Sequence, residues 1–210
     1  MIRAPRLIAI TDRRVATKAQ TLERFERLAR AARPGTVLFQ LRDRDLTARE
    51  RLAFGGQLKA LSVAAQQGFQ VNDRLDLARL LDADGVHLGE AGVSAEDARR
   101  LLGAACFVTR ACHGPDVPAE AGVDAWLVSP VAAERKGRPP LGLVSFGDLH
   151  ARCLAAAGPT VRPALYALGG IDADNARACL DAGATGVAVI GAGLTASDPL
   201  PLLRALDIAR

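Results

Sequence analysis

Short, almost wholly apolar runs recur along this sequence and alternate with longer stretches in which apolar residues follow a helical spacing. A brief apolar run bounded by polar or glycine residues is typical of a strand buried on both faces, whereas apolar positions three and four residues apart are typical of a helix. The runs predict strands at residues 7–10, 37–41, 69–71, 85–88, 107–111, 125–128, 165–168 and 187–190. The helical spacing predicts helices at residues 21–32, 47–66, 75–81, 117–121, 172–182 and 200–208, one that begins after the N-cap Ser94, and one that ends at Ala157.

This order of elements predicts the fold class. Eight strands that alternate with eight helices in 210 residues indicate an α/β protein, a (βα)8 TIM barrel in which residues 1–210 form a single domain. A doubly wound open sheet is the alternative, but the GxGxxG turn that would follow its first strand is absent from the sequence.

The two last predicted strands end in glycines. One run continues through Gly169 and Gly170, and the other ends at Ile190 and is followed by Gly191. Bare backbone N–H groups at such turns can approach a phosphate closely, and the loops after strands seven and eight of a TIM barrel are the usual phosphate seat. The sequence therefore predicts a site for a phosphorylated small molecule.

Polar residues follow the ends of the other predicted strands, where the active site of a barrel lies. The second strand ends in Gln40, Arg42 and Arg44, the third in Asn72 and Asp73, and the loop after the sixth carries Glu134, Arg135, Lys136 and Arg138. Arginine and lysine suit phosphate oxygens, and an aspartate beside an asparagine suits Mg²⁺ that also takes substrate oxygens. The structural alternative is that Asp73 caps the helix that begins near Arg74 and that Arg42 pairs with Asp43 or Asp73.

The histidines differ in what their positions predict. His113 lies just beyond the fifth strand, where an unburied imidazole could act as an acid or base. His87 lies within an apolar strand and is interpreted as a core or rim histidine, while His150 falls on an outer helix. Cys112 is interpreted as small filler near the mouth of the barrel.

The composition of the chain narrows the classes of ligand and of protein that fit this sequence. The net charge of +4 is mild and aromatic residues make up 4% of the chain, which favours small anionic substrates over nucleic acid. No apolar run is long enough for a membrane span, and no signal peptide is recognised, so a cytoplasmic protein with reduced cysteines is expected. The oligomeric state is not fixed by the sequence, and a homo-oligomer stays open.

Taken together, the motifs resemble those of the thiamine phosphate synthase/TenI family. The matching segments span nearly the whole chain in order, and they are residues 8–13, 39–44, 71–74, 83–89, 136–143, 168–171 and 186–190. The resemblance implies a TIM barrel that acts in vitamin B1 synthesis. The synthase of this family joins hydroxymethylpyrimidine diphosphate to a thiazole phosphate with Mg²⁺ and releases diphosphate, so the implied partners are small phosphorylated substrates.

The resemblance also implies roles for particular residues. Gln40 would contact the pyrimidine, and Arg42, Arg44 and Asn72 would hold the diphosphate. Asp73 would ligate Mg²⁺ and Lys136 would assist the leaving group. The backbone at Gly169, Gly170, Ile190 and Gly191 would cradle the thiazole phosphate.

Three departures from the family pattern leave the exact reaction open. Gly92 stands where the synthase usually has a second Mg²⁺ aspartate, with Glu90 the only carboxylate nearby, and Ala111 replaces the usual serine. Ala133 and Arg135 replace two threonines of the sixth-strand loop. These changes favour the TenI-type thiazole tautomerase, which needs no metal and would use His113, whereas the intact Gln40, Arg42, Asn72 and Asp73 favour the synthase. A non-catalytic binder of thiazole phosphate is the third reading.

Overall fold

The eight apolar runs form the eight strands of a closed, all-parallel barrel in this computed structural model, which describes residues 5–114, 116–135, 137–157 and 164–210. Each strand pairs with the next in the chain, and β1 closes the barrel against β8. The strands are β1 (Leu7–Ile10), β2 (Val37–Leu41), β3 (Gly68–Asn72), β4 (Gly85–Leu88), β5 (Phe107–Cys112), β6 (Ala125–Val128), β7 (Ala164–Leu168) and β8 (Gly186–Val189). The predicted (βα)8 TIM barrel is confirmed.

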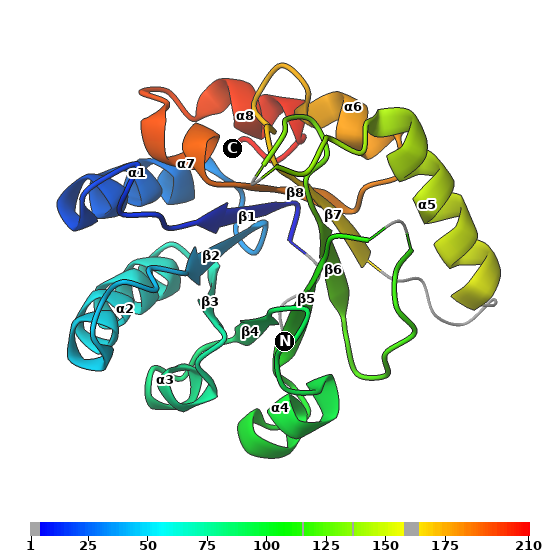
Figure 1. Ribbon diagram of the computed structural model, residues 1–210. Helices are drawn as coiled ribbons and strands as arrows, with labels where there is room; N and C mark the ends of the chain where they lie inside the picture. The colour runs from blue at the N-terminus through cyan, green and yellow to red at the C-terminus, as the bar shows by residue number, and fades with distance from the viewer. Residues whose placement is uncertain (1–4, 115, 136, 158–163) are drawn as a thin grey trace.

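Helices surround the barrel on the outside (Figure 1). Within the described residues they are α1 (Lys18–Ala31), α2 (Ala48–Ala64), α3 (Leu75–Leu80), α4 (Ala95–Leu102), α5 (Leu143–Ala157), α6 (Ala176–Asp181), α7 (Gly191–Thr195) and α8 (Leu200–Ala205). Local sequence sets where they begin. Thr17 and Thr47 form capping boxes with Gln20 and Glu50, and the Ser94 side chain accepts from the backbone N–H of Asp97, as predicted for an N-cap.

The helix predicted at residues 117–121 is wrong, because the described residues between β5 and β6 contain no helix. Pro118 lacks the N–H that a helix interior needs, and the segment is held by other contacts. The Glu120 carboxylate accepts from the backbone N–H of Ala95 at 2.9 Å and pairs with Arg110 Nε at 2.7 Å. The segment therefore joins the start of α4 to β5 instead of forming a helix of its own.

The core lies between the barrel and its helices. Phe25 of α1 and Phe39 of β2 stack with ring centroids 4.7 Å apart, and Phe54, Phe69, Phe146 and Tyr166 are also fully buried. No helix in the described part of the chain is long and apolar enough to cross a membrane. The rigid barrel presents the carboxyl ends of all eight strands at one mouth.

Candidate active site

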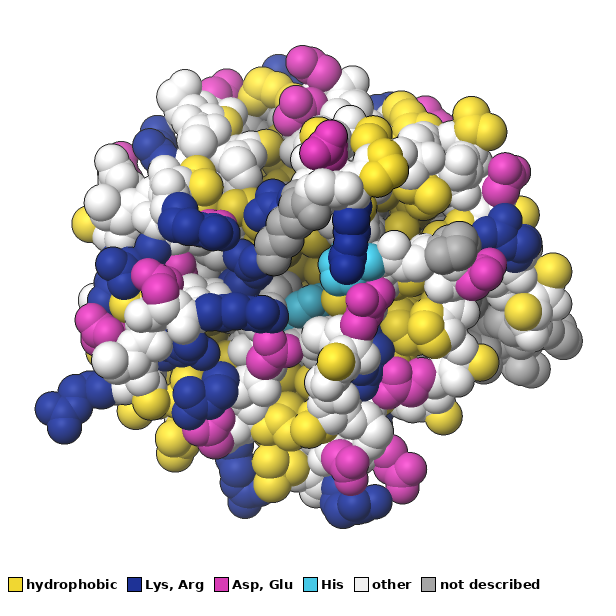
Figure 2. Space-filling model, in the orientation of Figure 1, with side chains coloured by type: hydrophobic (Ala, Val, Ile, Leu, Met, Phe, Trp, Pro, Cys, Tyr) yellow, Lys and Arg dark blue, Asp and Glu magenta, His cyan; other side chains and the backbone are white. Residues whose placement is uncertain are grey.

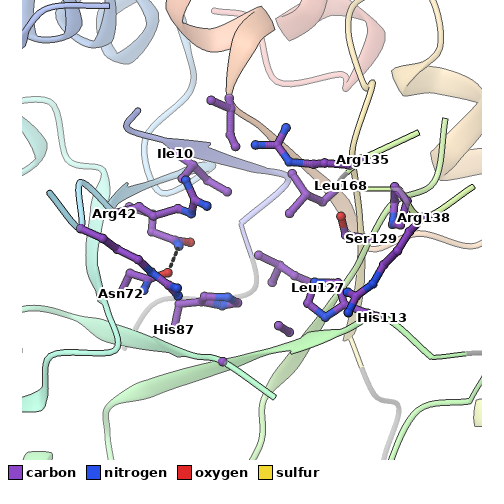
Figure 3. Close-up of a pocket in the computed structure, with 16 residues that line it drawn as sticks. Ile10, Arg42, Asn72, His87, His113, Leu127, Ser129, Arg135, Arg138 and Leu168 are labelled. Carbon is purple, nitrogen blue, oxygen red and sulfur yellow. Dashed lines mark hydrogen bonds between the residues drawn. The ribbon is translucent and has the colours of Figure 1, made fainter. Parts of the chain in front are cut away.

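A cavity opens at the carboxyl ends of the strands, where Figure 2 shows lysine and arginine side chains gathered around a central hollow with histidine at its floor. The residues that line the cavity include four arginines and no carboxylate, so it suits an anion. They are Ile10, Gln40, Arg42, Arg44, Asn72, His87, Gly89, Ala111, His113, Leu127, Ser129, Pro130, Arg135, Arg138, Leu168 and Ile190. Figure 3 shows Arg42 and Arg135 on opposite sides of this space.

Arg42 is held in place at the end of β2. Its backbone N–H donates to Thr11 Oγ1 at 2.9 Å, and its Nη1 lies 3.5 Å from Asp12 Oδ2. Burial lowers the pKa of the guanidinium, an effect that Asp12 opposes and that the positive charges of Arg44 and Arg135 reinforce. Arg42 is therefore a partly desolvated cation among other cations, which is a favourable place for a polyanionic ligand.

Asp73 lies at the edge of the same cavity. Its Oδ2 accepts from Arg44 at 2.6 Å and from Asn72 Nδ2 at 2.7 Å, and its Oδ1 accepts from the backbone N–H of Gly89 at 3.0 Å. The structural alternative from the sequence is wrong, because no side chain caps α3 at Arg74 and the acidic partner of Arg42 is Asp12. The carboxylate predicted to hold Mg²⁺ thus belongs to the mouth of the barrel.

Glu90 and His113 form a close pair on the β5 side of the cavity. The backbone N–H of His113 donates to Glu90 Oε1 at 2.6 Å, and His113 Nδ1 lies 3.0 Å from Glu90 Oε2. Partial burial alone would raise the pKa of Glu90, but its hydrogen bonds with His113 outweigh burial and lower it. Because a carboxylate only accepts, the Nδ1 of His113 carries a proton.

Arg110 lies near the end of β5 but does not line the cavity. Only 5% of this residue is exposed, and its guanidinium donates to the carbonyls of Gly89, at 2.9 Å, and of Glu90 and Val93. Arg110 therefore fixes the loop after β4, the loop that carries the N–H group bonded to Asp73.

A second cavity adjoins the first and is lined by the glycine turns that follow β7 and β8. It contains Gly169, Gly170, Ile190, Gly191 and the start of the short helix α7, and it shares Leu168, Arg135 and Ile190 with the first cavity. The carbonyl of Gly169 accepts from the backbone N–H groups of Ala132 and Ala133 at 2.8 and 3.2 Å, so the loop that carries Arg135 packs on this turn. This is the place predicted for a phosphate.

The Gly170 turn gives a testable prediction. Gly170 has φ +73°, and a Cβ at this position would lie 2.4 Å from Ala133 Cβ and 2.7 Å from Ala133 N. Gly170→Ala adds about 1–2 kcal/mol of backbone strain and displaces the Arg135 loop, so affinity for a phosphate monoester should fall by at least about tenfold. Calorimetric titration measures the loss. Gly56→Ala, on α2 with open space around its Cβ, is the control and should bind normally.

His87 faces the cavity from β4 and contacts Thr109 Oγ1 through Nδ1 at 2.9 Å, so it is a rim histidine with a polar partner (Figure 3). Burial lowers its pKa from 6.5 to about 4. The sequence interpretation of His87 as a core or rim residue is consistent with this position. Cys112 is buried, and burial raises the pKa of its thiol to about 11, which fits its interpretation as filler.

The lowered pKa of His87 predicts an acid-sensitive fold. Between pH 6.5 and about 4 the unfolded chain binds a proton at this imidazole and the folded chain does not, so the free energy of unfolding falls as the pH falls. The full effect is roughly 3 kcal/mol, present above pH 6.5 and lost by about pH 4. Urea unfolding at both ends of this range measures it, and His87→Gln should remove most of the drop; an equal drop in both proteins would contradict the assignment.

Lys136 lies outside the described residues. Gln40, Arg42, Arg44, Asn72, Gly169, Gly170, Ile190, Gly191 and His113 all line one of the two adjoining cavities, and Asp73 and Glu90 border the first. Gln70 and Thr109 were not predicted from the sequence, and both are fully buried and bonded to polar residues of the site. The sequence feature that could have identified them is a polar residue within an apolar strand that is buried on both faces.

Comparisons with known proteins agree on one family. The family model described as thiamine monophosphate synthase matches residues 7–192. A thiamine-phosphate synthase from Thermus thermophilus is 40% identical over 204 residues, covering 95% of this chain and 93% of the relative. One from Natronomonas pharaonis is 39% identical over 174 residues, covering 80% and 79%. The solved structure of a thiamine phosphate pyrophosphorylase from Pyrococcus furiosus superposes with a TM-score of 0.75 at 26% identity, covering 96% and 95%.

Proposed function

This chain belongs to the thiamine monophosphate synthase family, and from that premise we propose that it joins hydroxymethylpyrimidine diphosphate to a thiazole phosphate to give thiamine phosphate and diphosphate. The observation that carries the proposal is the pair of adjoining cavities. One is lined by four arginines and suits a diphosphate, and the other is lined by glycine turns and suits a phosphate monoester. Because they share a wall, two phosphorylated substrates can lie side by side.

The chemistry follows from this arrangement. The bond between the pyrimidine methylene carbon and the diphosphate oxygen breaks, and its electron pair leaves with the diphosphate. The thiazole nitrogen then donates its lone pair to the methylene carbon. Arg42 and Arg44 stabilise the charge that develops on the leaving oxygens, and the two cavities hold the reacting atoms together, so no protein nucleophile is required.

Mg²⁺ is the cofactor that this reaction implies, and the described residues fit it in part. They contain no cluster of three or more carboxylate, histidine or cysteine side chains able to hold a metal by themselves. Mg²⁺ at phosphate sites usually needs only one or two carboxylates, with the remaining oxygens from substrate and water. Asp73 would be the protein ligand, and bound Mg²⁺ would neutralise charge on the diphosphate. Both oxygens of Glu90 contact His113, so Glu90 as a second ligand stays a prediction.

The test is an assay of the purified protein with both substrates, with and without Mg²⁺. We expect thiamine phosphate and diphosphate in equal amounts, dependent on Mg²⁺. No product from two substrates that both bind would contradict the proposal and favour the non-catalytic binder.

One observation favours a second candidate activity, the tautomerase reaction of the TenI branch. Nδ1 of His113 is engaged by Glu90, which leaves Nε2 as the ring nitrogen that can exchange a proton with a ligand in the cavity that His113 lines. Aromatisation of a thiazole carboxylate phosphate without metal, lost in His113→Gln, would support it. An isomerisation rate unchanged in that variant would exclude His113 as the base.

A further inference from the structure

A chain of buried amides connects Asp73 to the interior of the barrel. Asn72 donates to Asp73 Oδ2 through its Nδ2, and Gln40 Nε2 donates to Asn72 Oδ1 at 3.2 Å, the contact drawn as a dashed line in Figure 3. The Asp73 carboxylate also accepts from Arg44 and from the backbone N–H of Gly89, so it is the acceptor at this end of the chain. It therefore fixes the orientation of both amides.

The chain continues across β3 and β5 to His87. Gln70 Nε2 donates to Gln40 Oε1 at 2.8 Å, and the Thr109 hydroxyl donates to Gln70 Oε1 at 3.3 Å. His87 Nδ1 lies 2.9 Å from the same hydroxyl oxygen. Gln70 and Thr109 are completely buried, so water does not compete for these bonds.

The direction of the chain decides the tautomer of His87. Each amide must donate toward Asp73 and accept from the other side. The Thr109 hydroxyl therefore donates its single proton to Gln70. Thr109 can then only accept from His87, which places the imidazole proton on Nδ1. Nε2 is left with a lone pair.

That lone pair faces the cavity. No described residue donates to Nε2, and Nε2 is not among the side-chain polar atoms that are fully buried without a hydrogen-bond partner in the described part of the chain. Nε2 is therefore open to the cavity that His87 lines. A ligand group that meets it must be an N–H or O–H donor, because a carbonyl there would place two lone pairs against each other.

We propose that His87 is a specificity-determining residue, a fixed acceptor that selects a heterocyclic diphosphate with an exocyclic amino group over its oxo analogue. The inference rests on the proposed function for the diphosphate, whose ring must lie on the cavity floor between the arginines and the barrel interior. Asp73 sets this specificity from a distance, through four intervening side chains.

The first test reads the tautomer directly. Long-range proton–nitrogen NMR correlation on histidine-labelled protein without ligand distinguishes the two neutral forms, and His113→Gln and His150→Gln assign the signals. We expect His87 to be protonated on Nδ1. Protonation on Nε2 would overturn the proposal, whatever the enzymatic activity.

The second test separates recognition from folding. Titration with the amino-ring and oxo-ring diphosphates should show at least about a hundredfold preference for the amino ring in the wild type. His87→Phe should lose most of this preference and keep the affinity due to the diphosphate. Thr109→Val removes the acceptor for Nδ1–H and should weaken the preference about tenfold, whereas Thr109→Ser should restore it. Equal preference in wild type and His87→Phe would contradict the inference.

The two proposals fail in different ways. If the amino-ring diphosphate is preferred and the tautomer is as expected, but no thiamine phosphate forms, the proposed synthase reaction is wrong and the role of His87 stands. If product forms while His87 carries its proton on Nε2, the role of His87 alone is wrong.

Discussion

Replacement of Arg42 by alanine should lower kcat/KM of the proposed synthase reaction by about a hundredfold to a thousandfold, the range seen when one preorganised donor to a developing anion is removed. Arg42 combines a partly desolvated guanidinium with a backbone fixed by Thr11, so its fork is held before the ligand arrives. Arg42→Lys keeps the charge and loses the planar fork, so it should fall between wild type and Arg42→Ala. Steady-state kinetics with the pyrimidine diphosphate varied measures both.

The loss should be one of catalysis and not of folding. Arg14 donates to both oxygens of Asp12, at 2.9 and 2.6 Å, so that buried carboxylate keeps a cationic partner when Arg42 is absent. These hydrogen bonds are the largest cause of the lowered pKa of Asp12. Arg14→Ala is the matched control, because it removes an exposed arginine from the same aspartate and does not line the cavity. Equal loss in both variants would show that Arg42 acts through Asp12.

Much of the fold was predictable because buried parallel strands and helices with one apolar face leave different patterns in a sequence. The exceptions involve tertiary contacts. Residues 117–121 have a helical spacing of apolar residues, but Glu120 is committed to Arg110 and the start of α4. The short helix α7 is rich in glycine, which has low helix propensity, so it was not predicted. Its glycine fits close packing, because a Cβ at Gly193 would lie 3.2 Å from Val189 Cγ2.

The charged part of the candidate site was predictable for a different reason. Residues at the carboxyl ends of barrel strands converge whatever the details of packing, so Arg42, Asn72 and Asp73 could be placed at one mouth. The side chains with which they pair could not be predicted, because the pairing depends on the register between strands. Arg42 pairs with Asp12 across from β1 and not with its neighbour Asp43. The chain from Asp73 to His87 likewise needs the pairing of Gln40 with Gln70 and of His87 with Thr109.

The second large effect is expected at Asp73. Asp73→Asn should raise the Mg²⁺ concentration for half-maximal rate by about a hundredfold and lower kcat/KM by a similar factor, because the carboxylate that pairs with Arg44 becomes neutral. Asparagine is the right substitution. Asp73 has φ +60°, a conformation that asparagine tolerates and alanine does not, and an amide oxygen can still accept from the Gly89 N–H.

Two further variants show whether this effect belongs to metal binding. Asp76→Asn removes an exposed carboxylate three residues away that pairs with Arg74, and it should leave the Mg²⁺ dependence unchanged. Glu90→Gln tests whether Glu90, the second carboxylate near the mouth, contributes to Mg²⁺ binding. The question arises because Gly92 stands where the family pattern has a second Mg²⁺ aspartate. Because both oxygens of Glu90 contact His113, we expect its half-saturating Mg²⁺ concentration to stay close to that of the wild type. A shift as large as that of Asp73→Asn would instead mean that substrate binding turns Glu90 from His113 to the metal, and that the pair seen without ligand is the resting arrangement of a two-carboxylate site.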